Sequence, residues 1–579
     1  MSLVAVTAER PRLRSSARAR SKASAVMSEH ARPRSQHRPE QRPAGVLVDP
    51  GRNPAFRGAP GEPRTPLPRP ELAPEPHLSR QGCARVVVRF DRPSSCALRP
   101  TILKLPITVV PTPTSRGLTG LVIALVLAIE APAGAQDTRR APPPDFALVG
   151  GTVIDGTASP PRPKCTVVVR GGRIAAVGPD EAVPEGVTTI DVTGRCILPG
   201  MIDMHGHLYA NDGKTIRNQF VPYALLYLAG GVTTVFSPGD FDPEGTVAFR
   251  ESVKRGEAIG PRVLTAGPYF DHRPSHLGWI RGVNSADEAR QLFDAWKGRI
   301  DGVKVYTSIQ EPELVAVIGS AHEAGLRVVG HLDSVTATRA IELGIDGLEH
   351  GIFTMSELAG PSPDYFPTTA WLAKLAALDV DAPPMKPLIA SIVERHVVID
   401  PTTVTFQELL PDFVAVAPDW KRFIAPESVK PIDDLFAMLR QEASKQGPQW
   451  LEAAHGALRK QNQFVKAVHD RGGIVVTGTD PVGVDLVPGY ALHRELRNLV
   501  EAGFTPLEAI KAATQDAARA LRRDAEIGTI APGKVADLVV VGGDPAHAID
   551  DVGRTEIVIA GGVRHDPAEL RRLAEKGIK

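Results

Sequence analysis

Cysteine is scarce in this chain, with 4 residues among 579. Cys83, Cys96, Cys165 and Cys196 include no C-x-x-C pair, so the sequence gives no sign of a zinc knuckle or a dithiol redox motif. Cys165 and Cys196 fall in one predicted sheet region, where a disulfide is conceivable only if the protein is exported. We therefore expect these cysteines to be structural or incidental.

Long apolar runs are also missing. Residues 118–129 (LTGLVIALVLAI) form a run of about 12 residues, whereas a membrane-spanning helix needs roughly 20. The run follows Arg116 and precedes an A-x-A sequence at residues 133–135, an order typical of a secretory signal peptide. We therefore expect no stable membrane span and an exported protein whose translation starts after about residue 110. If the segment is not a signal, a cytoplasmic or membrane-anchored protein is expected instead.

Clustered positive charge is absent from the larger part of the chain. Residues 1–120 hold 21 Lys and Arg against 8 Asp and Glu, which leaves 46 against 58 for the rest. Nucleic-acid binding needs a clustered cationic surface, so we expect no nucleic-acid partner. Residues 1–115 are basic and rich in Pro and Arg, with too few periodic apolar residues to offset the entropy of ordering, and we expect disorder there. Residues 116–135 are the signal-like segment.

The remaining residues show two kinds of secondary-structure pattern. Residues 146–199 and 522–568 read as short β segments separated by Gly and Pro, and we expect these two ends to pair into one small β-sandwich. Between them, residues 200–521 alternate apolar β runs with helical patterns. The runs are ILPGMIDMHGH, VTTVFSPG, RVLTAGP, GVKVYTS, LRVVGHL, IDGLEHG, VVIDPTTV and GIVVTGTD. Eight such runs in a span of this size predict the α/β fold class with a (β/α)8 TIM barrel.

Candidate metal ligands stand at the ends of these runs. They are His205 and His207 on the first run, Lys304 on the fourth, His331 on the fifth, His350 on the sixth and Asp480 on the eighth. The carboxyl ends of barrel strands converge on one face, so these residues are expected to meet. Strand side chains alternate with period two, so both histidines of the first run point to the same side. Imidazole and carboxylate are good ligands for zinc and similar divalent ions.

Six motifs occur in a characteristic order: PGMIDMHGH, DGVKVYTS, EAGLRVVGHLDS, GIDGLEHG, TGTD and IGTIAPGKVADLVVVGGDP. As a set they resemble the amidohydrolase superfamily, and more narrowly its imidazolonepropionase-like branch, which includes Xaa-Pro dipeptidases. The resemblance covers about residues 146–565. It implies two zinc ions: His205, His207 and Asp480 on one, His331 and His350 on the other, with Lys304 bridging them as a carbamate formed with CO₂. An unmodified Lys304 would leave one zinc ion.

The resemblance also implies a mechanism. A metal-activated hydroxide attacks a polarised carbonyl, and Asp480 is the catalytic base that takes the proton and passes it to the departing amine. Lysine must lose its proton to react with CO₂, and burial lowers its pKa. We expect substrate contacts from the loop after the third run and from the end of the fourth, where the candidates are Tyr269, His272, Arg273, His276 and Tyr306. That loop, PYFDHRPSHLG, departs from the GGH segment of related enzymes.

The predicted reaction is hydrolysis of an amide bond in a dipeptide or an N-acyl amino acid, with a cyclic amide as the alternative substrate. Deaminases of the superfamily usually carry Glu three positions after the fifth-strand histidine, where this chain has Ser334. Deamination therefore ranks lower. A catalytically silent binding protein is a further alternative, because a fold does not fix a function. The expected partners are small molecules, and a homo-oligomer is compatible with the sequence.

Overall fold

The computed structural model describes residues 143–179, 181–211, 215–275, 278, 280–360, 367–415, 419–481 and 486–577. The predicted disordered extension, the signal-like segment, Cys83, Cys96 and His276 lie outside these ranges. Cys165 and Cys196 lie within them, and both are free and buried. Among the helices in these ranges, none combines the length and apolar character that crossing a bilayer requires.

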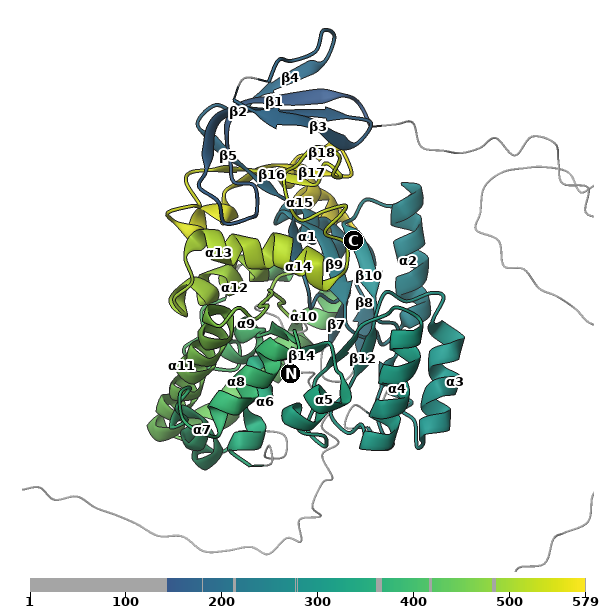
Figure 1. The fold of residues 1–579 in the computed structure, drawn as a ribbon, viewed down its shortest axis with the longest axis vertical. Coiled ribbons are helices and arrows are strands. Elements are labelled where there is room, and N and C mark those ends of the chain that lie inside the picture. Colours follow the sequence, from purple (N-terminus) through teal and green to yellow (C-terminus); the bar gives the residue numbers. More distant parts are fainter. Residues whose placement is uncertain are drawn as a thin grey trace, which may run out of the picture. The chain divides into compact units, whose positions relative to one another are not determined.

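Strands from both ends of the described chain form one eight-stranded sheet (Figure 1). Its strands are β1 (Phe146–Val153), β2 (Arg162–Arg170), β3 (Arg173–Gly178), β4 (Thr188–Asp191), β5 (Arg195–Pro199), β16 (Leu538–Gly542), β17 (Thr555–Ala560) and β18 (Val563–His565). β5 runs antiparallel to β16, with Ile197 opposite Val540. Both side chains are fully buried in an apolar cluster between the strands. This pairing joins the two ends of the described chain in one sheet. The predicted β-sandwich of two separate sheets stays a prediction.

The middle of the chain is α/β with parallel strands, as the sequence predicted. A three-stranded sheet holds β6 (Met201–Asp203), β9 (Val232–Ser237) and β10 (Arg262–Thr265). A five-stranded sheet holds β11 (Tyr269–Phe270), β12 (Val303–Val305), β13 (Val328–Gly330), β14 (Gly347–Glu349) and β15 (Val398–Asp400). A short hairpin of β7 (Tyr209–Asn211) and β8 (Ile216–Asn218) follows the first parallel strand. Each parallel strand coincides with an apolar run of the sequence or, for β11, continues one.

Strand pairing is not continuous around a closed barrel in the part of the chain that the structure describes. The third run is divided into β10 and β11 by Gly267, which has φ +68°, and by Pro268, which has no N–H to donate to a ladder. The eighth run joins β15 through an isolated bridge between Ile399 and Val475. It reaches β6 through the N–H of Met204, which donates to the carbonyl of Thr477 at 2.9 Å. The expectation of eight regular strands in one closed ladder is therefore only partly met.

Helices alternate with these strands. They are α1 (Phe220–Ala229), α2 (Pro243–Arg255), α3 (Ala286–Trp296), α4 (Glu311–Glu323), α5 (Ala337–Leu343), α6 (Gly351–Thr354), α7 (Thr369–Ala376), α8 (Met385–Glu394), α9 (Thr403–Gln407), α10 (Pro426–Lys445), α11 (Pro448–Asp470), α12 (Tyr490–Glu501), α13 (Pro506–Lys511), α14 (Ala517–Ala520) and α15 (Pro567–Lys576). Local sequence fixes several helix starts. Ser285 caps α3 by accepting a hydrogen bond from the N–H of Glu288, and Asp242 caps α2 in the same way. α3 buries Ala289 and Phe293 in the main apolar core.

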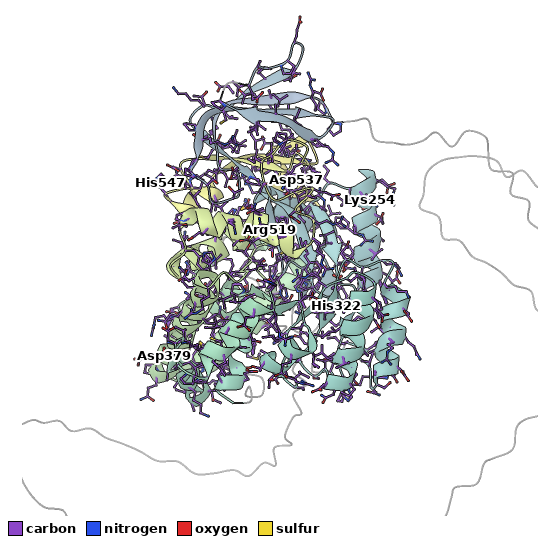
Figure 2. All side chains as sticks on the ribbon, in the orientation of Figure 1. Lys254, His322, Asp379, Arg519, Asp537 and His547 are labelled. Atoms are coloured by element: carbon purple, nitrogen blue, oxygen red, sulfur yellow. The ribbon has the colours of Figure 1, made fainter. Side chains whose placement is uncertain are left out.

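The parallel strands are tied to the eight-stranded sheet at Asp537, which Figure 2 labels. The Asp537 carboxylate pairs with the guanidinium of Arg262 on β10 at 2.8 Å. Its carbonyl accepts a 2.7 Å hydrogen bond from the N–H of Gly200, which links β5 to β6. These bonds fix the start of β6, the strand that leads to the first pair of histidines.

Candidate active site

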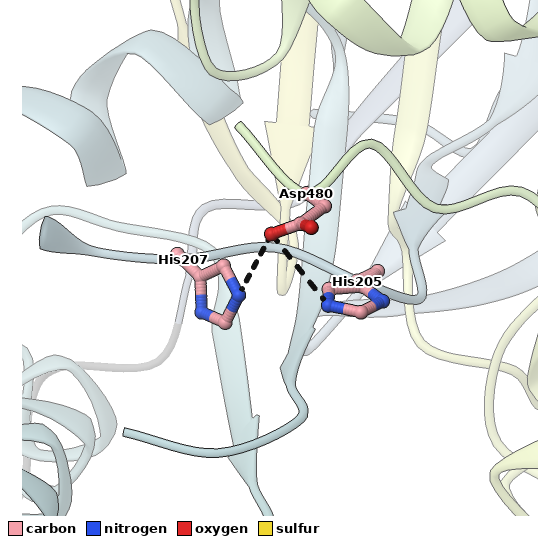
Figure 3. Close-up of side chains that lie close together, drawn as sticks. All are labelled: His205, His207 and Asp480. Carbon is pink, nitrogen blue, oxygen red and sulfur yellow. Dashed lines mark ion pairs between the residues drawn. The ribbon is translucent and has the colours of Figure 1, made fainter. Parts of the chain in front are cut away.

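Three buried side chains meet where β6 and the 474–480 segment end (Figure 3). The Nε2 atom of His207 lies 3.1 Å from Oδ1 of Asp480, and the Nε2 atom of His205 lies 3.7 Å from the same oxygen. At most 3% of any of the three side chains is exposed. The sequence predicted that these residues would meet, and the structure brings them together.

Backbone and side-chain bonds hold the two segments of this trio in register. The Asp203 carboxylate accepts hydrogen bonds from the N–H of His205 at 3.1 Å and from the N–H and hydroxyl of Thr479 at 3.1 and 2.6 Å. The N–H of Asp480 donates to the carbonyl of His205 at 2.7 Å. Burial raises the pKa of Asp203 to about 6. The Asp203 carboxylate therefore links the segment that carries the two histidines to the segment that carries Asp480.

Glycine is required between the two histidines. A Cβ at Gly206 would lie 2.5 Å from Cγ1 of Val235 and 2.7 Å from the hydroxyl of Tyr227. The Tyr227 hydroxyl itself accepts a 3.1 Å hydrogen bond from the N–H of His207. A larger residue at position 206 would displace that bond, so His-Gly-His is the pattern that this packing permits.

The other two predicted histidine ligands lie next to the trio. The ring centroids of His331 and His350 are 4.4 Å apart, and those of His205 and His350 are 4.9 Å apart. The Nδ1 atom of His350 lies 2.7 Å from the hydroxyl of Thr402, which leaves Nε2 available to a ligand. His350, Thr402 and Asp480 all have positive φ, at 59°, 42° and 43°. Left-handed backbone at non-glycine residues costs energy and is concentrated at functional sites.

Lys304 on β12 is enclosed in the same place, with 1% of its side chain exposed. Burial lowers the pKa of Lys304 to about 7, although the carboxylates of Asp480 and Asp400 act to raise it. Its ammonium group forms an ion pair with Glu349, the last residue of β14. We did not single out Glu349 from the sequence. Its position within the GLEHG motif, directly before His350, was the available signal.

The donor atoms form two overlapping groups among the described residues. His205, His207 and Asp480 make one, and His205, Glu349 and His350 make the other. Within each group the donor atoms lie within 4.8 Å of one another, and all the residues are buried. Imidazole nitrogen and carboxylate oxygen are the donors that zinc and similar divalent ions accept. The residues present therefore fit a divalent metal centre.

An arc of aromatic side chains borders these donors; we call Tyr209, Tyr269, Tyr306 and Phe353 the aromatic arc. The hydroxyls of Tyr209 and Tyr269 are 3.3 Å apart, and the rings of Tyr269 and Tyr306 are 5.2 Å apart. The rings of Tyr306 and Phe353 lie 5.1 and 4.7 Å from the ring of His331. Tyr269 and Tyr306 were predicted as substrate contacts and lie beside the donors. Tyr209, whose ring is 4.8 Å from that of His207, was missed.

Two other predicted substrate contacts are engaged elsewhere. His272 Nδ1 lies 2.7 Å from Oε1 of Glu313 on α4, and Arg273 pairs with Glu288 on α3. Both are therefore left out of the site that we propose. His276 lies outside the described residues. His322, labelled in Figure 2, pairs with Asp346 at 2.9 Å on the surface of α4.

Below the donors, Asp400 on β15 is enclosed in the interior. Burial raises its pKa well above the usual range, and neither of its oxygens has a hydrogen-bond partner among the described residues. Gly478 leaves room between Asp400 and His205, because a Cβ there would collide with the Asp400 carboxylate and would lie 2.5 Å from Cβ of His205. At the position where related deaminases usually carry Glu, Ser334 is exposed, and its N–H donates to the carbonyl of Thr307.

Comparison with known proteins identifies the family. A model of the amidohydrolase family matches residues 196–564. Adenine deaminase 3 of Rhizobium meliloti is 23% identical over 455 residues, which cover 75% of this chain and 59% of the deaminase. This chain therefore spans less than two thirds of the length of that relative.

Solved structures show the same fold. A Bifidobacterium longum protein that carries the name prolidase superposes with a TM-score of 0.57 at 25% identity, covering 76% of this chain and all of the other. A Xaa-Pro dipeptidase solved with bound methionine has a TM-score of 0.55 at 21% identity, covering 73% of this chain and all of the other. The shared fold thus extends over about three quarters of this chain.

Proposed function

Because this chain belongs to the amidohydrolase family, we propose that it is a metal-dependent hydrolase that cleaves carbon–nitrogen bonds. The buried group of His205, His207 and Asp480 carries this proposal, since its donor atoms lie within 4.8 Å of one another. Buried ionisable groups cost free energy unless they are paired or bind a metal. We take the two parallel sheets as parts of a (β/α)8 barrel whose strand ends present these donors.

His205, His207 and Asp480 would hold one ion, and His331 and His350 would hold a second. Carboxylated Lys304 would bridge the two, and an unmodified Lys304 would leave one ion. Zinc suits this donor set, and a bound zinc ion lowers the pKa of water and polarises a carbonyl. Asp480 is the residue that we propose as the proton carrier between water and the departing amine, because its carboxylate lies among the donors.

A dipeptide or an N-acyl amino acid is the substrate class that we propose first. The aromatic arc would line the site with apolar surface for a substrate side chain beside the donors, and a Xaa-Pro dipeptidase is among the solved structures with the same fold. A cyclic amide is the alternative substrate. Deamination is the second candidate reaction, because Adenine deaminase 3 is among the relatives, although exposed Ser334 speaks against it.

A substrate panel tests these possibilities. Zinc-loaded protein is offered Xaa-Pro and other dipeptides, N-acyl amino acids, lactams and adenine, with detection of new amine, new acid and free ammonia. We expect an amide of the first two classes to be cleaved. Ammonia released from adenine would establish the deaminase, and lactam opening without dipeptide cleavage would establish the cyclic-amide alternative.

Asp480→Asn tests the site itself. Loss of a general base costs roughly 10²–10⁴-fold in rate, so the variant should lose at least a hundredfold in turnover of whichever substrate is found. Asp379→Asn is the matched control, because Asp379 is an exposed aspartate labelled at the surface in Figure 2. Equal activity of the two variants would contradict the proposed site. A wild-type protein that binds panel compounds without cleaving any of them would support the silent binding protein.

A further inference from the structure

Glu349 belongs to one of the two donor groups, although none of the roles described above uses it. Its side chain is 4% exposed, and its carboxylate contacts the ammonium group of Lys304. Its Oε2 atom also lies 3.6 Å from Nδ1 of His205. Among the described residues, His205 Nδ1 has no hydrogen-bond partner. His205 Nδ1, a possible donor, and Glu349 Oε2, an acceptor, are therefore both buried and lie just beyond hydrogen-bond distance of each other.

The backbone explains why Glu349 and His350 both face the site. Successive side chains of a strand point to opposite faces, so two adjacent residues would ordinarily be separated. His350 instead has φ 59°, which ends the strand and turns its side chain. The donor atoms of Glu349, His350 and His205 consequently lie within 4.8 Å of one another.

The two nitrogens of His205 face different carboxylates. Nε2 lies 3.7 Å from Asp480 and Nδ1 lies 3.6 Å from Glu349. An imidazole that binds a metal through Nε2 carries its proton on Nδ1, and a carboxylate that accepts this proton fixes both the tautomer and the ring orientation. Glu349 is placed to be that acceptor.

Lys304 offers Glu349 a second donor. Its Nζ atom carries hydrogen as an ammonium group. It also keeps one N–H as a carbamate, since an amine and CO₂ give a carbamate with release of one proton. The contact between Glu349 and Lys304 can therefore persist in either form.

We propose that Glu349 is a positioning residue of the metal centre, which accepts hydrogen bonds from Nδ1 of His205 and from Nζ of Lys304. It keeps the ligating side of each residue turned toward the space bordered by His207 and Asp480. This inference rests on the proposed metal-dependent function. It differs from a role as a direct ligand, in which the Glu349 carboxylate would itself bind an ion.

Glu349→Gln tests the proposal, because glutamine keeps the size of the side chain and removes its charge. The number of zinc ions per chain and their dissociation constants are measured by competition with a chromophoric chelator, together with the visible spectrum of the cobalt-loaded protein. Loss of a group that orients a metal ligand costs roughly 10–100-fold in metal affinity. We expect Glu349→Gln to show this loss of zinc affinity, to bind the same number of ions per chain as the wild type, and to have an altered cobalt spectrum.

Glu313→Gln is the matched control, since Glu313 is a buried glutamate of α4 that pairs with His272. It should lower the melting temperature without changing zinc affinity or the cobalt spectrum. Wild-type zinc affinity in folded Glu349→Gln would overturn the positioning role. Loss of one whole ion per chain would also overturn it, in favour of direct ligation. A wild-type protein without bound metal would instead contradict the proposed function.

The wild-type protein gives an independent readout should the variant fail to fold. In histidine-labelled, zinc-loaded protein, ¹⁵N NMR should show His205 protonated at Nδ1 and metal-bound at Nε2. An Nδ1 atom without a proton would overturn the proposal.

Discussion

The hydroxyl of Thr479 donates a 2.6 Å hydrogen bond to the carboxylate of Asp203. This bond joins β6, which leads to His205, to the segment that leads to Asp480. Both residues are fully buried, so the bond is shielded from water. It explains how two candidate ligands that are far apart in the sequence, His205 and Asp480, are held within 4 Å of each other.

Thr479→Val should weaken both the fold and the metal centre. Removing one partner of a buried hydrogen bond costs about 1–3 kcal/mol, because the other partner stays desolvated. Chemical denaturation of the metal-free protein and zinc titration measure the two effects. Thr477→Val is the control, since Thr477 is equally buried but its hydroxyl makes a longer contact of 3.5 Å with the carbonyl of Ile202. Equal losses in the two variants would show that the Asp203 bond has no special role.

Gly478→Ala should disrupt zinc binding. The added Cβ would lie 2.5 Å from Cβ of His205, and it would also collide with the Asp400 carboxylate. Overpacking of this kind typically costs about 1–3 kcal/mol and should displace the imidazole. Zinc content and the melting temperature report the effect. Gly319→Ala, in α4, is the control because its Cβ would meet no atom within 4 Å. A Gly478→Ala protein with full zinc affinity would contradict the close packing of this site.

Lys304 should make the stability of the metal-free protein depend on pH. Burial lowers its pKa from 10.5 to about 7, so between these values the unfolded chain binds more protons than the folded chain. The contribution of Lys304 to the free energy of unfolding therefore rises with pH across this window and is lowest below about pH 7. To isolate this contribution, the free energies of unfolding of the wild type and of Lys304→Met are measured in the presence of chelator at several pH values. A difference that stays constant from pH 7 to pH 10 would refute the lowered pKa.

Tyr269→Phe should change substrate binding more than metal binding. It removes a hydroxyl that lies 3.3 Å from the hydroxyl of Tyr209 in the aromatic arc, and it keeps the ring. We expect the Tyr269 hydroxyl to hydrogen-bond to the substrate as well. Loss of one neutral hydrogen bond to the substrate is worth about 0.5–1.5 kcal/mol, which corresponds to a severalfold rise in KM with unchanged zinc content. Tyr223→Phe, at an equally buried tyrosine in the main apolar core, is the control. An equal rise in KM in both variants would contradict a contact between Tyr269 and the substrate.

From the sequence, the candidate ligands could be predicted to meet because each of them lies at the end of an apolar run. His205, His207, His331, His350 and Asp480 come together since parallel strands end on one face. Glu349 and Tyr209 could not be singled out in this way. Glu349 faces the site because His350 takes a left-handed conformation, which the alternation of a strand does not predict.

The loop after the third run was the least predictable part. His272 and Arg273 follow β11 in the sequence, but Glu313 of α4 and Glu288 of α3 hold their side chains. These partners come from helices that follow later in the chain, so local sequence does not identify them. The break in the third run, in contrast, has a local cause. The apolar run predicts where a strand is favoured, but Gly267 and Pro268 within it interrupt the hydrogen-bonded ladder where β10 ends and β11 begins.

Zinc content and activity measured on one sample test the metal-dependent site most directly. The purified wild-type protein is stripped with chelator, assayed on the substrate found by the panel, and titrated with zinc alongside His207→Asn. We expect hydrolysis to disappear on stripping, to return in proportion to bound zinc in the wild type, and to stay absent in His207→Asn. Hydrolysis that persists in fully stripped protein, or that returns equally in His207→Asn, would contradict a metal centre built on His205, His207 and Asp480.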